Sequence, residues 1–421
     1  MSHDIKTAIE TIPIPPELAE RSKKGIENAK LELEQTKAIN RPYKLWMAAS
    51  VLGIALLASV AFHPQVLAAI QKAVQFIPGI GMALEEEVPK ERYILQEPVT
   101  VEIGNGSLTV TGVMADSEVT HITMNGINIE RMQSIQVIND KGDVYNLDSS
   151  IATMAGSQFS ASFWHRGALD LQQDVQIVIP GNPETVIPLQ LELAKSFASY
   201  QDMGETASVN DVMITAIAHR IGDRARISLV SKHPKAFRIS DYGIHPVRDD
   251  KRLTITDDAG KSYEIDRSLG LSSPAREFYF PLSEHAKKYT LTIPEIQAEY
   301  HSTAKLTLEV PAEREAEVNK TIELAGFPIQ ITKVERIDRE DGSRGLRVYT
   351  NVGYDEQAPV SLHRFSIDRS HMIKLNEQTM AVEYIEFDIE PDVRKVKLTF
   401  ERPEVLIKGP WIFEFPADRY F

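Results

Sequence analysis

The chain has 421 residues, of which 43% are hydrophobic and 25% are charged, so most of it can bury a core and global disorder is excluded. Acidic residues outnumber basic ones by 60 to 46, and the net charge of −14 argues against a protein whose main work is to bind nucleic-acid phosphates directly. Because the sequence contains no cysteine, disulfide scaffolds, cysteine-ligated metals and thiol nucleophiles are excluded.

The first 44 residues are predicted to hold one amphipathic helix. Pro15 and Pro16 precede Glu17, and proline is favoured where helices start. The apolar residues that follow fall on one narrow face: Leu18, Ile26, Ala29 and Leu33. A single helix of this length cannot bury such a face by itself, so it either binds a groove on a cytosolic partner or forms a solvated tail.

Residues 45–62 are predicted to cross a membrane as a helix. These 18 residues carry no charge, and aromatic residues lie at both ends as in an interfacial belt, with Tyr43 and Trp46 at one end and Phe62 at the other. The alternatives are a buried helix of a soluble protein and a cleaved secretory signal. A secretory signal fits poorly because 44 residues precede the apolar core.

The charges beside this segment predict its orientation. Four basic residues lie in the fifteen positions before it (Lys30, Lys37, Arg41 and Lys44), whereas the twenty positions after it hold only Lys72. Positive charge is retained on the cytoplasmic side. We therefore expect a single-pass protein of the cell membrane, with its N-terminus in the cytoplasm and its C-terminus outside the cell.

Residues 63–92 are predicted to form a juxtamembrane helix and a linker. Pro64 follows the apolar segment, and the polar residues of the stretch 65–76 recur at helical spacing. This stretch is expected to form a short helix at the outer membrane surface or a kinked extension of the span.

The rest of the chain contains three copies of one β unit, which we call the first repeat (93–197), the second repeat (205–312) and the third repeat (317–421). Each opens with hydrophobic residues in the spacing φ-x-φ-x-x-φ: Leu108, Val110 and Val113; Val212, Ile214 and Ile217; Ile329, Ile331 and Val334. Each ends with an alternating triad, a strand near a proline and a closing strand. The closing strands are expected at 189–193, 306–310 and 411–415.

Each copy has about seven short strands in roughly 100 residues, which is typical of immunoglobulin-like sandwiches. We therefore predict a mainly β protein: one N-terminal transmembrane helix followed by three tandem immunoglobulin-like antiparallel β-sandwiches, joined near 194–204 and 311–317.

The sequence offers little that points to catalysis. It has no phosphate-binding loop, dinucleotide fingerprint, G-x-S-x-G or H-E-x-x-H motif. We expect no enzyme activity, no catalytic residue, no cofactor and no bound metal. His165 beside Trp164 is most simply a surface histidine in a loop. The Asp140-x-Gly142 and Asp258-x-Gly260 motifs are too short for an EF-hand and are explained by hairpin turns.

The residues around the predicted membrane segment resemble a known family. The opening Ile14-Pro15-Pro16-Glu17-Leu18, the single span and the segment Ile77-Pro78-Gly79-Ile80-Gly81 together resemble membrane-bound anti-sigma factors of the extracytoplasmic-function class in Gram-positive endospore-forming bacteria. Many relatives in that group are domains of unknown function. The resemblance covers about residues 10–110.

The resemblance implies a regulator of transcription. In that family the cytoplasmic segment sequesters a sigma factor, an outer domain receives a signal, and proteolysis near the membrane releases the sigma factor. By position, the docking face would be Leu18, Ile26, Ala29 and Leu33, and cleavage would fall near Ser59, Ala61, Val66 and Ala68. The expected partners are a sigma factor, the membrane and an extracellular ligand. The alternative is a structural or adhesive surface protein with a stalk of sandwiches.

Overall fold

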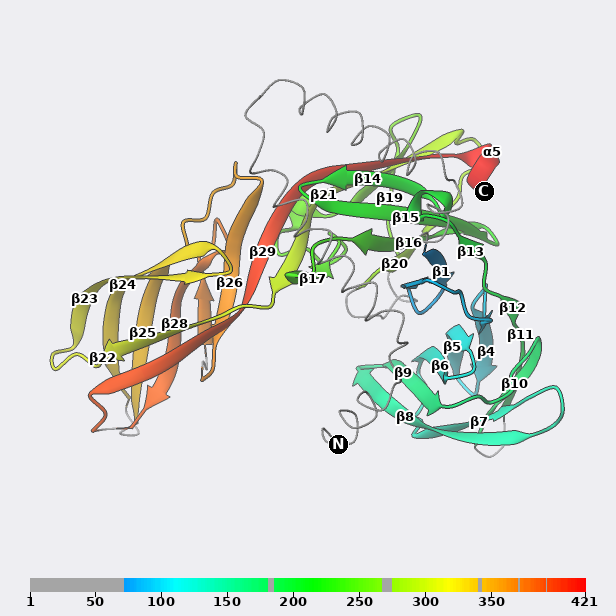
Figure 1. The fold of residues 1–421 in the computed structure, drawn as a ribbon, viewed down its shortest axis with the longest axis horizontal. Coiled ribbons are helices and arrows are strands. Elements are labelled where there is room, and N and C mark those ends of the chain that lie inside the picture. Colours follow the sequence, from blue (N-terminus) through cyan, green and yellow to red (C-terminus); the bar gives the residue numbers. More distant parts are fainter. Residues whose placement is uncertain (1–71, 181–184, 267–274, 340–342, 370–371, 391) are drawn as a thin grey trace, which may run out of the picture. The chain divides into compact units, whose positions relative to one another are not determined.

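The computed structural model describes residues 72–421 apart from 181–184, 267–274, 340–342, 370–371 and 391. These residues form one compact unit that is mainly β, with several antiparallel sheets (Figure 1). The only helical turns among them are η2 (Tyr200–Asp202), η3 (Asp249–Lys251) and α5 (Ala417–Tyr420).

In this part of the chain no helix is both long and apolar enough to cross a membrane. The predicted span at 45–62 and the predicted cytoplasmic helix lie outside the described residues.

The helix predicted within 65–76 is wrong for the residues that the structure describes. Strand β1 (Ala73–Ile77) pairs with β2 (Met82–Glu86) and with β13 (Ser196–Phe197). Val74 and Phe76 alternate with Gln75, and this period-two pattern carries their side chains into contact with residues of the second repeat. Tertiary pairing therefore outweighs the helical spacing of the polar residues.

The first repeat folds as one continuous antiparallel sheet whose two halves share a core. Its strands are β3 (Tyr93–Ile94), β4 (Val99–Ile103), β5 (Gly106–Ala115), β6 (Val119–Ile127), β7 (Ser134–Ile138), β8 (Val144–Ala155), β9 (Gln158–Arg166), β10 (Asp174–Ile179), β11 (Thr185–Gln190) and β12 (Glu192–Leu193). Strand β8 pairs with β7 through its first half and, after a bulge, with β9 through its second half. The core draws on both halves, with Val110 and Phe163 from one and Val137 and Ile177 from the other.

The second and third repeats contribute three sheets. A four-stranded sheet contains β14 (Glu205–Val209), β15 (Val212–Ile221), β16 (Arg224–Lys232) and β20 (Glu277–Pro281). A five-stranded sheet contains β23 (Glu315–Leu324), β24 (Phe327–Asp338), β25 (Arg344–Asn351), β27 (Met372–Leu375) and β28 (Val382–Ile389). The third sheet contains β17 (Phe237–Asp241), β18 (Thr254–Asp257), β19 (Ser262–Tyr263), β21 (Lys288–Tyr300), β22 (Thr303–Glu309), β26 (Val360–Ile367) and β29 (Lys395–Pro416).

The closing strands of the second and third repeats are exchanged. The strand expected to close the second repeat, β22, pairs with the first part of β29, with Leu306 opposite Leu398. The strand expected to close the third repeat is the last part of β29, and it pairs with β21 of the second repeat, with Phe413 opposite Leu291. Figure 1 shows β29 in red running from the strands of the third repeat to those of the second. Each of these two closing strands therefore pairs with a strand of the other repeat.

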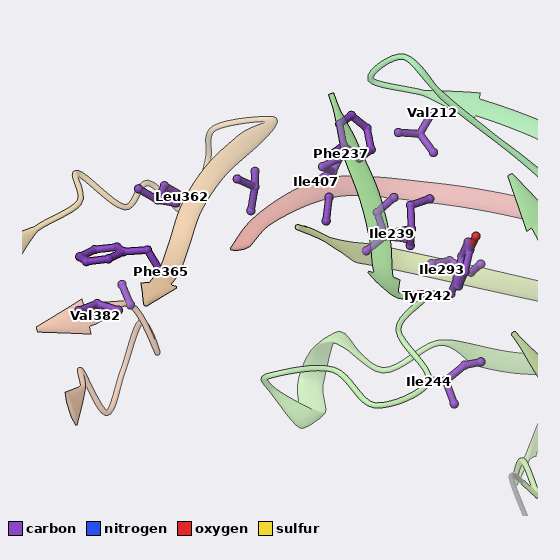
Figure 2. Close-up of a cluster of buried hydrophobic side chains, with 14 of the residues drawn as sticks. Val212, Phe237, Ile239, Tyr242, Ile244, Ile293, Leu362, Phe365, Val382 and Ile407 are labelled. Atoms are coloured by element: carbon purple, nitrogen blue, oxygen red, sulfur yellow. The ribbon is translucent and has the colours of Figure 1, made fainter. Parts of the chain in front are cut away.

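The exchange joins the two repeats through one hydrophobic core. Their buried residues form a single cluster, part of which is drawn in Figure 2 with Tyr242 from the second repeat and Phe365 from the third. Ile407, in the middle of β29, pairs with Ile296 on one side and Val360 on the other. The boundary predicted between residues 312 and 317 thus separates segments of sequence that fold together.

The two Asp-x-Gly motifs form hairpin turns, as predicted. The amide of Gly142 donates to the carbonyl of Asn139 at 3.1 Å, and the amide of Gly260 donates to the carbonyl of Asp257 at 3.0 Å. Both glycines have positive φ, which suits a residue without a Cβ. Strands β24 and β25 also pair with each other, and residues 340–342 between them lie outside the described residues.

Candidate ligand-binding site

The site residues predicted from the sequence all precede Lys72. Neither the docking face (Leu18, Ile26, Ala29 and Leu33) nor the cleavage positions (Ser59, Ala61, Val66 and Ala68) fall within the described residues. His165 lies in strand β9, not in a loop, and its neighbour Trp164 is 51% exposed and stacks on His121 at a centroid distance of 4.8 Å.

The hairpin of β1 and β2, which we call the N-terminal hairpin, contacts both the first and the second repeat. Phe76 packs with Val230 of the second repeat in one apolar cluster. Ile77 and Ile80 pack with Ile94 and Met114 of the first repeat in another cluster. The hairpin therefore buries opposite faces against two repeats, which follows from the alternation of side chains along a strand.

The turn of the N-terminal hairpin lies close to the first repeat and is hydrogen-bonded to the second. Gly79 has φ +73°, and a Cβ built there would lie 1.8 Å from the carbonyl oxygen of Thr111 in the first repeat. Its amide donates a hydrogen bond of 3.1 Å to the buried carboxylate of Glu277 in the second repeat. Arg276 donates to the carbonyl of Gly81, also at 3.1 Å. Glycine at position 79 is required both by its backbone conformation and by this close approach.

One buried arginine is hydrogen-bonded to both strands of the N-terminal hairpin. Arg92 is 3% exposed, and its guanidinium donates to both oxygens of Glu86 at 2.7 Å, to Asp116 at 3.1 Å and to Gln75. The hydrogen bond from Arg92 lowers the pKa of Glu86. Every part of this buried charge is therefore matched by an acceptor, as a stable buried ion requires.

A difference in strand register turns part of the second repeat toward the N-terminal hairpin. In the first and third repeats a bulge follows the second residue of the φ-x-φ-x-x-φ pattern, so Val113 and Val334 return to the core. Strand β15 has no bulge in its pairing with β16. Ala216 consequently takes the core position, and Ile217 packs on the opposite face beside Phe76.

That opposite face forms one wall of a pocket of about 560 Å³, which we call the junction pocket. Its volume is in the usual range for small-molecule sites. The first repeat, the N-terminal hairpin and the second repeat all contribute to it. The apolar lining is Phe76, Pro78, Ile94, Leu95, Val99, Pro188, Phe197, Ile217 and Ala218, and the polar lining is Gln96, Glu97, Gln190, Glu192, Lys195, His219 and Arg226.

The charges of the junction pocket differ in burial. Lys195 and Glu192 are exposed, whereas Arg226 is 3% exposed. His219 lies 3.8 Å from the carboxylate of Glu97. Burial lowers the pKa of His219, and the positive charge of Arg226 lowers it further. The imidazole is therefore uncharged at neutral pH, and Arg226 supplies the buried positive charge of the pocket.

Sequence reasoning missed this site because its residues come from distant segments. The motif Ile77-Pro78-Gly79-Ile80-Gly81 was the available signal, since two glycines beside a proline indicate a tight turn. Arg226 alternates with Ala225 and Ile227, which are buried in the core, so the pattern of β16 alone predicts a solvated arginine.

Comparison with known proteins gives no identification. No family model and no curated protein matches the chain. A conserved domain protein from Bacillus anthracis is similar to 72% of this chain over 90% of its own length, at 11% identity and a TM-score of 0.21. A cycloalternan-forming enzyme from Listeria monocytogenes, in complex with a pentasaccharide substrate, is similar to 70% of this chain over 29% of its own length, at 11% identity and a TM-score of 0.13. Both TM-scores are too low to carry an argument.

Proposed function

We propose that the protein is a membrane-anchored regulator of the anti-sigma-factor type. The cytoplasmic helix would sequester a sigma factor through Leu18, Ile26, Ala29 and Leu33, and residues 45–62 would cross the membrane. The three repeats, as immunoglobulin-like sandwiches outside the cell, would receive the signal. The sequence features near the membrane support the first two parts of the proposal.

The N-terminal hairpin supports the third part. It is the first described element after the predicted span, and Phe76 and Pro78 line the junction pocket. A ligand in this pocket would touch both repeats and the hairpin that leads toward the membrane. Ligand binding would then change the equilibrium between docked and released hairpin by its difference in affinity for the two states. Release of the hairpin would pass the signal to the segment where cleavage is proposed.

The sigma-factor step is tested by affinity capture and by deletion. Residues 1–44 are used as bait in a lysate of the native host, and we expect a sigma factor to be recovered. Deleting residues 1–36 from the full chain should abolish a transcriptional response. An unchanged response combined with lost surface binding would favour the adhesive protein instead.

The hairpin step is tested by two matched glycine substitutions in the full-length chain. Gly79→Ala forces a Cβ into the backbone of Thr111, whereas Gly104→Ala introduces a Cβ at φ +60° with no atom within 4 Å. Both substitutions carry the backbone strain of a positive φ, but only the first displaces the hairpin. We expect Gly79→Ala alone to change basal transcription from a sigma-dependent reporter. Equal effects of the two substitutions would refute the coupling through the hairpin.

A further inference from the structure

Two arginines near the N-terminal hairpin are buried to the same extent but differ in their partners. Arg92 and Arg226 are each 3% exposed. Arg92 is hydrogen-bonded by two carboxylates and an amide, as described above. In contrast, Nε and Nη1 of Arg226 have no hydrogen-bond partner, and no ion pair joins Arg226 to any carboxylate among the described residues.

The polar groups near Arg226 have other partners or carry no charge. Glu277 lies on the neighbouring strand, but its Oε1 accepts hydrogen bonds from Ser228 at 2.6 Å and from the amide of Gly79 at 3.1 Å. Tyr279 is paired directly with Arg226 in the sheet and hydrogen-bonds with its side chain, and burial raises the pKa of its phenol to about 12 despite the opposing charge of Arg226. The phenol is therefore neutral at physiological pH. The carboxylate of Glu97 lies 3.8 Å from Nε2 of His219.

A buried guanidinium without an anionic partner is unfavourable, because desolvation of the charge is not offset. A ligand that supplies an anionic partner would offset this cost. A planar guanidinium matches the geometry of a carboxylate or phosphate and can donate two parallel hydrogen bonds to either. The junction pocket that Arg226 lines has room for a small molecule, and its lining combines apolar with polar residues.

We propose that the junction pocket binds a small organic anion, whose carboxylate or phosphate pairs with Arg226 and whose apolar part packs against Phe76, Leu95 and Ile217. The assignment names the class of ligand for the sensing step and rests on the proposed function for its physiological meaning. Lys195, exposed on the wall of the pocket, adds a second positive charge, and the lining also holds the carboxylates of Glu97 and Glu192.

Binding is tested by calorimetry on the full-length chain in lipid nanodiscs. The probes are 4-phenylbutyrate, phenyl phosphate and the uncharged 4-phenylbutanol. We expect saturable binding of at least one of the two anions and at least tenfold weaker binding of the alcohol. The difference between the two anions tells whether carboxylate or phosphate is preferred. Equal affinity for the alcohol, or no binding of either anion, would overturn the proposal.

The role of Arg226 is tested by comparing three substitutions. Arg226→Gln should weaken anion binding at least tenfold and leave the melting temperature of the ligand-free protein unchanged or higher, since an unpaired buried charge is removed. Arg226→Lys should retain part of the affinity. Arg92→Gln should lower the melting temperature, because it breaks a satisfied buried network. If Arg226→Gln destabilised the ligand-free protein as much as Arg92→Gln does, Arg226 would be a structural residue and the proposal would fail.

These measurements are independent of transcription. Anion binding without any sigma factor captured by residues 1–44 would refute the proposed function and leave the ligand class standing. Capture of a sigma factor without anion binding would do the reverse.

Discussion

The strand exchange predicts that Trp411, near the end of the third repeat, stabilises the second repeat. Its side chain is fully buried, and Nε1 donates a hydrogen bond of 3.0 Å to the carbonyl of Val212 at the start of β15. Its backbone pairs with Ile293 of β21. The substitution Trp411→Ala removes both the packing and the hydrogen bond.

The expected cost is a large fraction of a domain's stability. Truncating a buried tryptophan costs about 3–5 kcal/mol, and leaving the Val212 carbonyl unpaired adds about 1–3 kcal/mol. A domain is usually stable by about 5–15 kcal/mol. Since about 1.4 kcal/mol corresponds to a tenfold change in an equilibrium, a loss of about 4 kcal/mol raises the population of the opened state about a thousandfold.

Native-state hydrogen exchange of the full-length chain measures this effect by region. We expect the amides of β15 and β16 in the second repeat to lose protection strongly. Ile412→Ala serves as the control, because the neighbouring side chain is 52% exposed and its truncation should change stability by about 0.5 kcal/mol or less. Loss of protection confined to β24 and β25 of the third repeat would show that the closing strands are not exchanged.

Three further predictions concern the exchange and the buried charges. The chain has no cysteine, so cysteines can be introduced in pairs to test the exchange. Thr290→Cys with Glu414→Cys should form an intramolecular disulfide between β21 and β29, detected by electrophoretic mobility. Thr290→Cys with Lys305→Cys, the pair expected if the strands were not exchanged, should form none. His363 is fully buried without a partner for either ring nitrogen, and burial lowers its pKa to about 4. Between this value and the usual pKa of histidine, the unfolded state binds a proton that the folded state does not. The free energy of unfolding should therefore fall by about 3 kcal/mol as the pH falls from 6.5 to 4. His363→Gln should remove that slope in urea titrations, and an unchanged slope would assign it to other groups. The hydrogen bond from Arg248 lowers the pKa of Glu356 to about 2, so the ionised carboxylate stabilises the fold above pH 4.5 and this stabilisation is lost as the pH falls toward 2. Because the Glu356 side chain is 37% exposed, we expect Glu356→Gln to lower the free energy of unfolding by about 1 kcal/mol at pH 7 and not at all at pH 2. An equal loss of stability at both pH values would argue against the ion pair.

The sequence by itself determined which side chains are buried in most strands. Alternation of apolar and polar residues is a local property with a period of two, and in the alternating triads near the ends of the repeats it places Phe159 and Phe163, Phe278 and Phe280, and Phe387 in the core. The turns at Gly142 and Gly260 were equally local, because a positive φ needs only the right residue at the right position.

Only the tertiary structure decided which strands pair. The closing strands of the second and third repeats carry the same apolar alternation, so either can fill either position, and the pattern holds no information about its partner. The same reason explains Ala73–Ile77, where a short segment with mixed spacing took its conformation from β2 and β13.

The candidate site depended on tertiary structure for a related reason. The missing bulge in β15, which turns Ile217 outward, leaves no mark in the φ-x-φ-x-x-φ spacing that all three repeats share. Arg226 became buried because the N-terminal hairpin and the first repeat cover a sheet face that the sequence of β16 presents as polar. Burial of a charge is a property of what packs over it, and that is decided by residues far away along the chain.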